Sequence, residues 1–336
     1  MSKEQQLLQD TIHHFIQPGK GILAADESTA TIGKRFATIS VDNTEDNRRR
    51  YRELLATTPE LGQYINGVIL FEETFSQHNN KGQRLSDLFL EQGIIPGIKV
   101  DKGLKHLSNT DDEQITEGLD GLADRLAHFK ELGARFAKWR AVYAITETTP
   151  SLAAIQTNAS DLARYAATCQ SLGIVPIVEP ELLMEGTHDI LHCAQIYEEI
   201  LHAVFHALFI HQVDLETIIL KPSMVTSGKN APEPDTVEEV ASYTLDLFRY
   251  NVPAAVPTIN FLSGGQTPEQ ATLYLNAINS QNPRPWILSF SFGRALQEEC
   301  LQAWRGEEGN IMLAQKTLLE RARRASLACL GQYHSK

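Results

Sequence analysis

Short apolar runs alternate with longer amphipathic stretches along almost the whole chain. Eight runs are rich in aliphatic and aromatic residues, and we expect each to form a strand: 21–28, 66–75, 94–101, 134–142, 173–182, 217–225, 254–265 and 285–294. These runs are apolar at successive positions, so both faces of each strand would be buried. That pattern is typical of parallel strands covered by helices and not of an antiparallel surface sheet.

Helical patterns lie between most of these runs. The clearest span residues 118–133, 160–173 and 188–212, and the first two end in Gly, a common helix stop. An amphipathic helix precedes the first strand, and another follows the last, over residues 310–330. Eight β–α units without a low-complexity linker predict a closed (β/α)8 barrel, the TIM barrel, as a single domain over residues 1–336. The alternative is a doubly wound open sheet, but no G-x-G-x-x-G motif follows any strand.

Composition narrows the classes of function. Of the 336 residues, 42% are hydrophobic and 21% are charged, and the net charge is -12. This acidic balance disfavours binding to nucleic acid or to an anionic membrane, because both need a basic surface. We find neither a signal peptide nor an apolar run of about 18 residues, and we expect a cytoplasmic protein. Its four widely spaced cysteines are typical of reduced, buried thiols: Cys169, Cys193, Cys300 and Cys329.

Charged and small polar residues gather where the expected strands end. In barrels of this kind the carboxyl ends of the strands form the mouth at which chemistry takes place. The residues there are Asp26, Lys99, Asp101, Lys138, Arg140, Glu179, Glu181, Lys221, Ser263, Gly264, Ser291, Gly293 and Arg294. One charge at a strand end usually marks only the point where the strand meets water. However, Lys138, Arg140 and Glu179 interrupt apolar runs, and buried charges must be paired or functional.

Two lysines beside carboxylates at one barrel mouth indicate amine catalysis. A lysine must lose its proton to act as a nucleophile, and its ordinary pKa is about 10.4. A second ammonium about 5 Å away, at an effective dielectric constant near 20, adds roughly 3 kcal/mol of repulsion and lowers that pKa by about two units. Such a pair gives a usable fraction of free amine at neutral pH, as a Schiff-base lysine requires.

Two further groups of residues predict phosphate sites. The loops after the seventh and eighth strands contain Ser263-Gly264-Gly265 and Gly293-Arg294, and these loops are the usual phosphate site of such barrels. A second basic group lies near the first strand and comprises Ser28, Thr31, Lys34 and Arg35, with Lys99 facing it. Two phosphate sites imply a bisphosphate. A Gly-Gly loop alone is weak support, because many loops need Gly for a positive φ.

Eight segments carry a resemblance to a known family. They occur in order from about Gly19 to Tyr333: GILAADEST, ILFEETF, GIKVDKG, FAKWR, GIVPIVEPE, LKPSMV, FLSGGQ and FSFGRAL. The chain therefore resembles class I fructose-bisphosphate aldolase of the animal and plant type. The resemblance implies a lyase of glycolysis and gluconeogenesis that cleaves fructose 1,6-bisphosphate reversibly into dihydroxyacetone phosphate and glyceraldehyde 3-phosphate. It further implies a lysine Schiff base, no metal or other cofactor, and a homotetramer.

The resemblance also implies a role for each matching residue. Lys221 would form the Schiff base, and Asp26 would be the base that drives cleavage. Lys138 and Glu179 would handle protons while the carbinolamine forms and loses water. The expected contacts of the 1-phosphate are Ser263, Gly264, Gly293 and Arg294, and those of the other phosphate are Ser28, Arg35 and Lys99. Thr31, Arg140, Glu181 and Ser291 complete the expected substrate contacts.

The chain departs from the family pattern at three places. Thr31 stands where many relatives have Ser and keeps the hydroxyl, and Glu72 stands where some have His. Family members usually carry a further tail that ends in Tyr, whereas the present sequence stops three residues after Tyr333. We therefore expect protonation of the enamine intermediate to be carried out by Glu179, a water or a residue of another subunit.

Three alternative functions remain open from the sequence. A metal-dependent aldolase is one, because His188 and His192, like His202 and His206, have i, i+4 spacing on an expected helix, although no third ligand is evident. Another Schiff-base sugar lyase, such as a transaldolase, is disfavoured by the two phosphate groups. An inactive scaffold is disfavoured because every expected catalytic position is filled, but a binding role in addition to catalysis stays open.

Overall fold

Eight parallel strands close into a barrel in the computed structural model, which describes residues 2–281 and 284–334. The strands are β1 (Gly21–Ala25), β2 (Ile65–Leu70), β3 (Ile95–Lys99), β6 (Phe136–Tyr143), β7 (Val175–Leu182), β8 (Ile219–Leu220), β9 (Thr258–Phe261) and β10 (Ile287–Phe292). They pair in this order, and β10 pairs back to β1. The expected (β/α)8 barrel is thereby confirmed, and the open doubly wound sheet is excluded.

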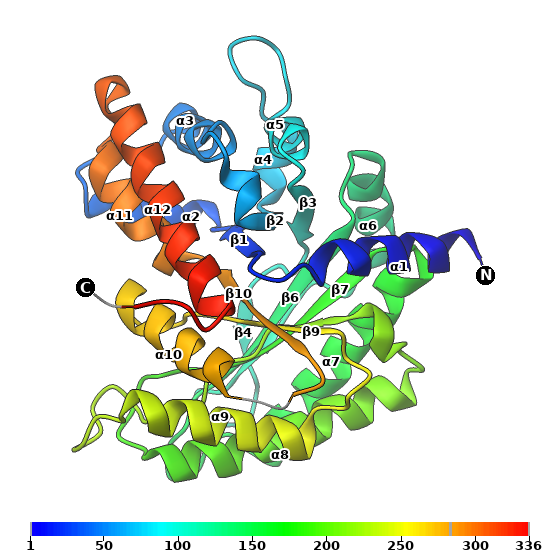
Figure 1. Ribbon diagram of the computed structural model, residues 1–336. Coiled ribbons are helices and arrows are strands. Elements are labelled where there is room, and N and C mark those ends of the chain that lie inside the picture. The colour runs from blue at the N-terminus through cyan, green and yellow to red at the C-terminus, as the bar shows by residue number, and fades with distance from the viewer. Residues whose placement is uncertain (1, 282–283, 335–336) are drawn as a thin grey trace.

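Helices surround the barrel, and the N-terminal helix lies across one of its ends (Figure 1). They are α1 (Lys3–Phe15), α2 (Thr29–Ala37), α3 (Glu45–Ala56), α4 (Glu72–Ser76), α5 (Leu85–Glu91), α6 (Leu122–Glu131), α7 (Leu152–Ser171), α8 (Ile190–Ile210), α9 (Val237–Asn251), α10 (Pro268–Ser280), α11 (Arg294–Trp304) and α12 (Ile311–Cys329). Short 3-10 turns span Leu61–Gln63, Leu215–Thr217 and Glu308–Asn310. The helix expected from residue 160 begins earlier, at Leu152, because the Ser151 side chain accepts a hydrogen bond from the Ala154 amide and caps the helix.

Several strands are shorter than their apolar runs. The largest difference is at β8, where the run 217–225 contains a strand of only two residues, Ile219–Leu220. Pro222 has no amide N–H and cannot extend the ladder. Ser223 instead pairs through its side chain, which accepts from the Leu182 amide at 2.9 Å. The chain therefore leaves β8 in a fixed direction although the regular strand has ended.

A small antiparallel hairpin between β3 and α6 was not expected from the sequence. Its strands are β4 (Leu104–His106) and β5 (Gln114–Thr116). The Thr116 hydroxyl donates to the carbonyl oxygen of Arg140 at 2.6 Å, so the hairpin is tied to β6. The hairpin thus forms part of the rim of the barrel mouth.

The interior of the barrel is filled by large apolar side chains at the end opposite the mouth. Helix α1 packs there and contributes Leu8, Ile12 and Phe15 to the interior cluster. The rings of Phe15 and Phe136 meet edge to face with centroids 5.0 Å apart. A side chain at Gly97 would meet Phe136 at 2.4 Å, so glycine is needed where this ring approaches β3. The filled interior leaves the carboxyl ends of the strands as the place where a ligand can enter.

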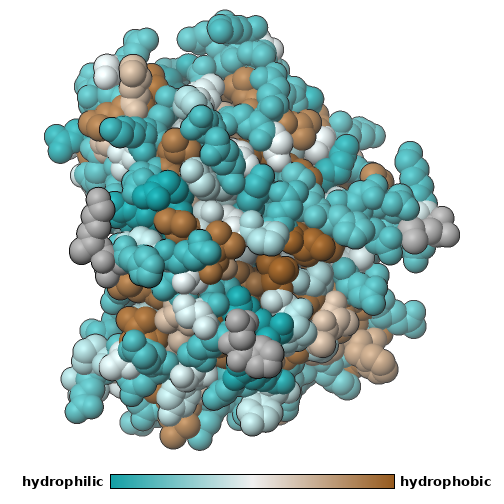
Figure 2. All heavy atoms as spheres, viewed as in Figure 1, coloured by the Kyte–Doolittle hydropathy of each residue, from teal (hydrophilic) through white to brown (hydrophobic). Residues whose placement is uncertain are grey.

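The surface opposite the mouth carries mostly hydrophilic residues with small apolar areas between them (Figure 2). Within residues 2–281 and 284–334, no helix has the length and apolar character required to cross a membrane. The four cysteines are buried free thiols, as expected.

Candidate active site

A continuous chain of buried ion pairs crosses the mouth of the barrel. Lys221, directly after β8, places Nζ 2.9 Å from Oε1 of Glu179 on β7. The other oxygen of Glu179, Oε2, lies 3.1 Å from Nζ of Lys138 on β6. Lys138 also donates to Oδ2 of Asp26, after β1, at 3.0 Å. All four expected catalytic residues therefore form one chain of contacts. Lys138 and Glu179 lie within their strands, and Asp26 and Lys221 directly follow theirs.

The carboxylates of this chain are held in their charged form. Burial opposes ionisation of Asp26, but the ammonium groups of Lys138, Lys221 and Lys99 outweigh it and hold the Asp26 pKa well below its ordinary value. Burial likewise opposes ionisation of Glu179, and Lys138, Lys221 and Arg140 lower its pKa. At Lys138 burial favours the neutral amine, yet Asp26 and Glu179 raise its pKa above the ordinary value, so it stays an ammonium.

The two lysines do not face each other directly, because the carboxylate of Glu179 lies between their ammonium groups. The sequence had suggested direct repulsion between them. The observed arrangement instead offers Lys221 a neighbouring acceptor, Glu179, to which a proton can pass before the amine attacks a carbonyl.

The backbone around Lys221 is fixed by bonds that replace a regular strand. The Lys221 amide donates to the Val178 carbonyl at 2.8 Å. Tyr197 on α8 donates its hydroxyl to the Pro180 carbonyl at 2.8 Å and accepts from the Ser223 amide at 2.9 Å. These contacts hold the segment that carries Lys221 against β7, which carries Glu179.

Two adjoining cavities open at the mouth and together are lined by every residue that the family resemblance assigned to catalysis or substrate binding. The first, of about 220 Å³, is lined by Asp26, Arg35, Lys138, Arg140, Glu179, Glu181, Lys221, Ser263, Gly264, Ser291, Gly293 and Arg294, among others. The second, of about 330 Å³, is lined by Asp26, Ser28, Thr31, Arg35, Lys99, Lys138 and Arg140, among others. Asp26, Arg35, Lys138 and Arg140 belong to both, so the cavities share a wall.

The first cavity contains the two glycine-rich segments at the ends of β9 and β10. Gly264 lies so close to β7 that an added side chain would meet Oε1 of Glu181 at 2.5 Å. Gly293 directly precedes α11, and Arg294 is the first residue of that helix, so the positive end of the helix dipole faces the same region. The buried hydroxyl of Ser291 has no hydrogen-bond partner within the described residues. Amides, a hydroxyl and a guanidinium are suitable donors for a phosphate.

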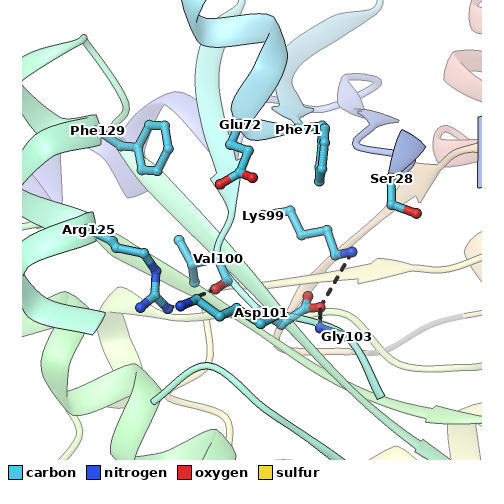
Figure 3. A pocket seen from close by; sticks show the side chains of 10 residues that line it. Ser28, Phe71, Glu72, Lys99, Val100, Asp101, Gly103, Arg125 and Phe129 are labelled. Carbon is cyan, nitrogen blue, oxygen red and sulfur yellow. Dashed lines mark hydrogen bonds and ion pairs between the residues drawn. The ribbon is translucent and has the colours of Figure 1, made fainter. Parts of the chain in front are cut away.

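The second cavity contains the basic group near β1. Ser28 caps α2, and its hydroxyl lies 3.1 Å from that of Thr31. Figure 3 shows Lys99 reaching from β3 between Ser28 and Asp101, and Nζ of Lys99 lies 3.4 Å from Oδ1 of Asp101. Lys34, which the sequence grouped with these residues, lies instead along the cleft between α2 and α11.

Sequence reasoning missed some of the residues around this mouth. Gly103 and Leu104, at the start of the unexpected hairpin, line the second cavity. Glu27 lines it as well, directly after Asp26, and pairs with Arg35. The only available signal for Glu27 was its position in the same charged strand end.

The histidines do not form the metal site that was considered from the sequence. Helix α8 begins at Ile190, so His188 precedes it and does not share a helical face with His192. Among residues 2–281 and 284–334, no cluster of three or more His, Cys, Asp or Glu side chains is arranged to hold a metal ion.

The fold and the residues at its mouth define an enzyme of the (β/α)8-barrel type, and comparison with known proteins narrows this class. The family model described as glycolytic, fructose-bisphosphate aldolase class-I, matches residues 7–336. Fructose-bisphosphate aldolase 1 of Toxoplasma gondii is 54% identical, over 97% of this chain and 90% of its own length. The cytoplasmic isozyme of Cicer arietinum is 55% identical, over 94% of this chain and 88% of its own length.

A solved structure agrees with these relatives. Fructose-bisphosphate aldolase from Plasmodium falciparum, determined in complex with TRAP and a small-molecule inhibitor, superposes with a TM-score of 0.98. It is 47% identical and the match covers 100% of this chain and 97% of that one. The chain belongs to the class I fructose-bisphosphate aldolase family. Its function is that of an aldolase of glycolysis, a lyase that acts on a sugar phosphate, so the expected family and reaction are confirmed.

Proposed function

We propose that the mouth of the barrel cleaves fructose 1,6-bisphosphate through a Schiff base on Lys221. The observation that carries this proposal is the contact chain from Asp26 through Lys138 and Glu179 to Lys221, because it supplies a nucleophile, an acid and a base at one place. In its free-amine form, Nζ of Lys221 adds to the ketone carbon C2. The carbonyl oxygen gains protons from Lys138 or Glu179 and leaves as water, giving a protonated imine.

Cleavage follows from the electron demand of the imine. Asp26 takes the proton of the C4 hydroxyl, the electrons of the C3–C4 bond move into the imine, and glyceraldehyde 3-phosphate leaves. The remaining enamine gains a proton at C3, and addition of water at C2 releases dihydroxyacetone phosphate and restores the amine. The lowered pKa of Asp26 supports its role, since a base must be ionised at neutral pH.

The two cavities account for the two phosphates of this substrate. We assign the 1-phosphate to Ser263, Gly264, Ser291, Gly293 and Arg294, on the Lys221 side of the mouth. The 6-phosphate is assigned to Ser28, Thr31, Arg35 and Lys99. Arg140 and Glu181 form an ion pair beside Lys138, and we assign them to the hydroxyl groups of the sugar.

Trapping the covalent intermediate tests the proposal directly. Borohydride added with fructose 1,6-bisphosphate should reduce the imine and leave a stable adduct on Lys221, which peptide mass spectrometry locates. Lys229, a surface lysine paired with Glu185, serves as the internal control and should stay unmodified. A substrate-dependent adduct on Lys138 alone, or on no lysine, would refute the mechanism.

The same proposal extends to how the protein exists in the cell. We propose that residues 1–336 act as one catalytic domain, in a cytoplasmic homotetramer; the Cicer arietinum relative, named a cytoplasmic isozyme, supports the location. Light scattering coupled to size-exclusion chromatography measures the assembly. A mass near that of one 37.5 kDa chain at micromolar concentration would contradict the tetramer.

A further inference from the structure

Glu27 is a buried carboxylate at the mouth that the proposed reaction leaves without a role. Its side chain is 4% exposed, and both of its oxygens have partners. Oε1 accepts hydrogen bonds from Arg35 and, at 2.9 Å, from Nε2 of Gln297. Oε2 accepts from Nη2 of Arg52 at 2.5 Å. Burial opposes ionisation of Glu27, but Arg35 and Arg52 lower its pKa, so it is a fully engaged, charged carboxylate.

The two arginines bound to Glu27 differ in their access to a ligand. The side chain of Arg52, on α3, is 4% exposed. That of Arg35, on α2, is 25% exposed and lines both cavities at their shared wall. Arg35 can therefore contact a bound molecule, whereas Arg52 serves as the buried counter-charge that helps to hold Glu27.

Other elements hold Glu27 in place. Nε2 of Gln297, on α11, donates to the Ala24 carbonyl on β1 at 2.7 Å as well as to Glu27. The hydroxyl of Tyr51, on α3, donates to Oε1 of Gln297 at 3.2 Å. The carboxylate is thus fixed between β1, α3 and α11. An arginine attached to a fixed carboxylate loses less rotational freedom on binding than one that is free in solvent, which is the advantage of preorganisation.

We infer that Glu27 is a positioning residue that holds the guanidinium of Arg35 at the wall between the two cavities, where Arg35 binds the 6-phosphate. The inference rests on the proposed function, from which the 6-phosphate site at Ser28, Thr31 and Lys99 is taken. Glu27 acts through Arg35 and not on the substrate, because its own oxygens are occupied by Arg35, Arg52 and Gln297.

Two substrates separate positioning from a general structural role. Fructose 1-phosphate lacks the group that Arg35 is inferred to bind, and fructose 1,6-bisphosphate carries it. Glu27→Gln keeps the shape of the side chain and removes its charge. We expect kcat/KM for the bisphosphate to fall at least tenfold, chiefly through KM, while that for fructose 1-phosphate stays within twofold. An equal loss for both substrates, or no loss for either, would overturn the inference.

A matched control breaks a similar pair elsewhere. Arg48 on α3 donates to both oxygens of Glu73 on α4, at 2.6 Å from Nη2 to Oε1 and at 2.8 Å from Nε to Oε2. Glu73→Gln should leave kcat/KM for both substrates within twofold. If Glu73→Gln lowers kcat/KM for fructose 1,6-bisphosphate but not for fructose 1-phosphate, then such a selective loss is a general response to breaking an ion pair, and the inference is wrong.

A double variant tests whether Glu27 acts through Arg35. In an Arg35→Ala background, Glu27→Gln should cause no further loss with the bisphosphate, and an additional loss above threefold would contradict positioning. If Glu27→Gln does not fold, Glu27→Asp replaces it in the test. Asp keeps the negative charge that buried Arg52 needs, but its side chain is one methylene shorter, so the carboxylate lies farther from Arg35. We expect the same selective loss in Glu27→Asp. An unchanged ratio of kcat/KM between the two substrates would refute the inference.

Borohydride trapping keeps this inference separate from the proposed function. An adduct on Lys221 in the wild type, together with an unchanged ratio between the two substrates in the Glu27 variants, refutes positioning alone. Absence of the adduct refutes the proposed function on which the inference rests.

Discussion

Replacing Glu179 by Gln removes the one carboxylate that separates the ammonium groups of Lys138 and Lys221. The three side chains are 3%, 7% and 4% exposed, so water compensates little for the lost charge. Breaking a buried ion pair by removing one partner costs about 3–5 kcal/mol. The two ammonium groups, which would then lie at most roughly 8 Å apart, add a repulsion of about 2 kcal/mol at an effective dielectric constant near 20. We expect Glu179→Gln to lower the free energy of unfolding by about 5–7 kcal/mol at pH 7.

The pH dependence of this loss identifies its cause. Burial opposes ionisation of Glu179, but Lys138, Lys221 and Arg140 lower its pKa in the folded state, so its contribution to stability is complete above about pH 4.5 and is lost as pH falls through the lower folded pKa. The difference from wild type should therefore shrink as pH falls below about 4. Urea unfolding followed by tryptophan fluorescence measures it, because Trp139, Trp286 and Trp304 are all buried. Both proteins are compared at one concentration, since assembly changes apparent stability.

An exposed pair provides the control for this measurement. Glu185 lies 3.3 Å from Lys229, and the two side chains are 69% and 43% exposed. Glu185→Gln should change the free energy of unfolding by less than about 0.5 kcal/mol at every pH. A loss below about 1 kcal/mol in Glu179→Gln, or a loss that does not depend on pH, would show that the carboxylate does not stabilise the paired lysines.

Three further results are expected. Burial opposes ionisation of Asp26, but Lys138, Lys221 and Lys99 lower its pKa in the folded state, so its contribution to stability is complete above about pH 4 and is lost as pH falls through the lower folded pKa. The free energy of unfolding of Asp26→Asn, measured with urea, should therefore fall less steeply below about pH 4 than that of wild type. Parallel curves for the two proteins would refute this. Arg294→Ala removes an exposed guanidinium from the proposed 1-phosphate site, so KM should rise about equally for fructose 1,6-bisphosphate and fructose 1-phosphate, by roughly 1.5–3 kcal/mol in binding. Unchanged steady-state kinetics would place Arg294 outside the site. Chelators should leave activity intact, because a protonated imine supplies the electron sink that a metal would supply; a loss in EDTA that zinc restores would contradict the Schiff-base mechanism.

The barrel was predictable because each of its strands is buried on both faces and therefore leaves an apolar run in the sequence. The ends of the strands were less predictable, since an apolar run says nothing about where hydrogen bonding stops. At β8 the ladder ends at Pro222 although the apolar character continues to Val225. The hairpin of β4 and β5 was missed for the opposite reason. Its strands have three residues each and are mainly polar, so they carry no apolar alternation.

The candidate site was predictable where one rule of geometry applied. Parallel barrel strands all end at one mouth, so charges at their carboxyl ends converge even when they are far apart in sequence. That rule does not say which charges touch. It brought Lys138 and Lys221 together but could not show that Glu179 lies between them. It also left out Glu27, whose partner Gln297 is 270 residues away in the sequence and lies within helix α11, not at the end of a strand.

The pattern of pairing at the mouth explains how an acidic protein can attract a phosphorylated substrate. Its lysines and arginines are largely neutralised within the protein: Lys99 by Asp101, Lys138 by Asp26 and Glu179, Arg140 by Glu181, Lys221 by Glu179, and Arg35 by Glu27. Arg294 differs, because it is exposed and forms no ion pair within residues 2–281 and 284–334. It also stands at the positive end of α11. Under the proposed assignment, we expect an incoming dianion to meet Arg294 first, which would place the 1-phosphate, and hence the ketone beside it, next to Lys221 before the paired charges need to move.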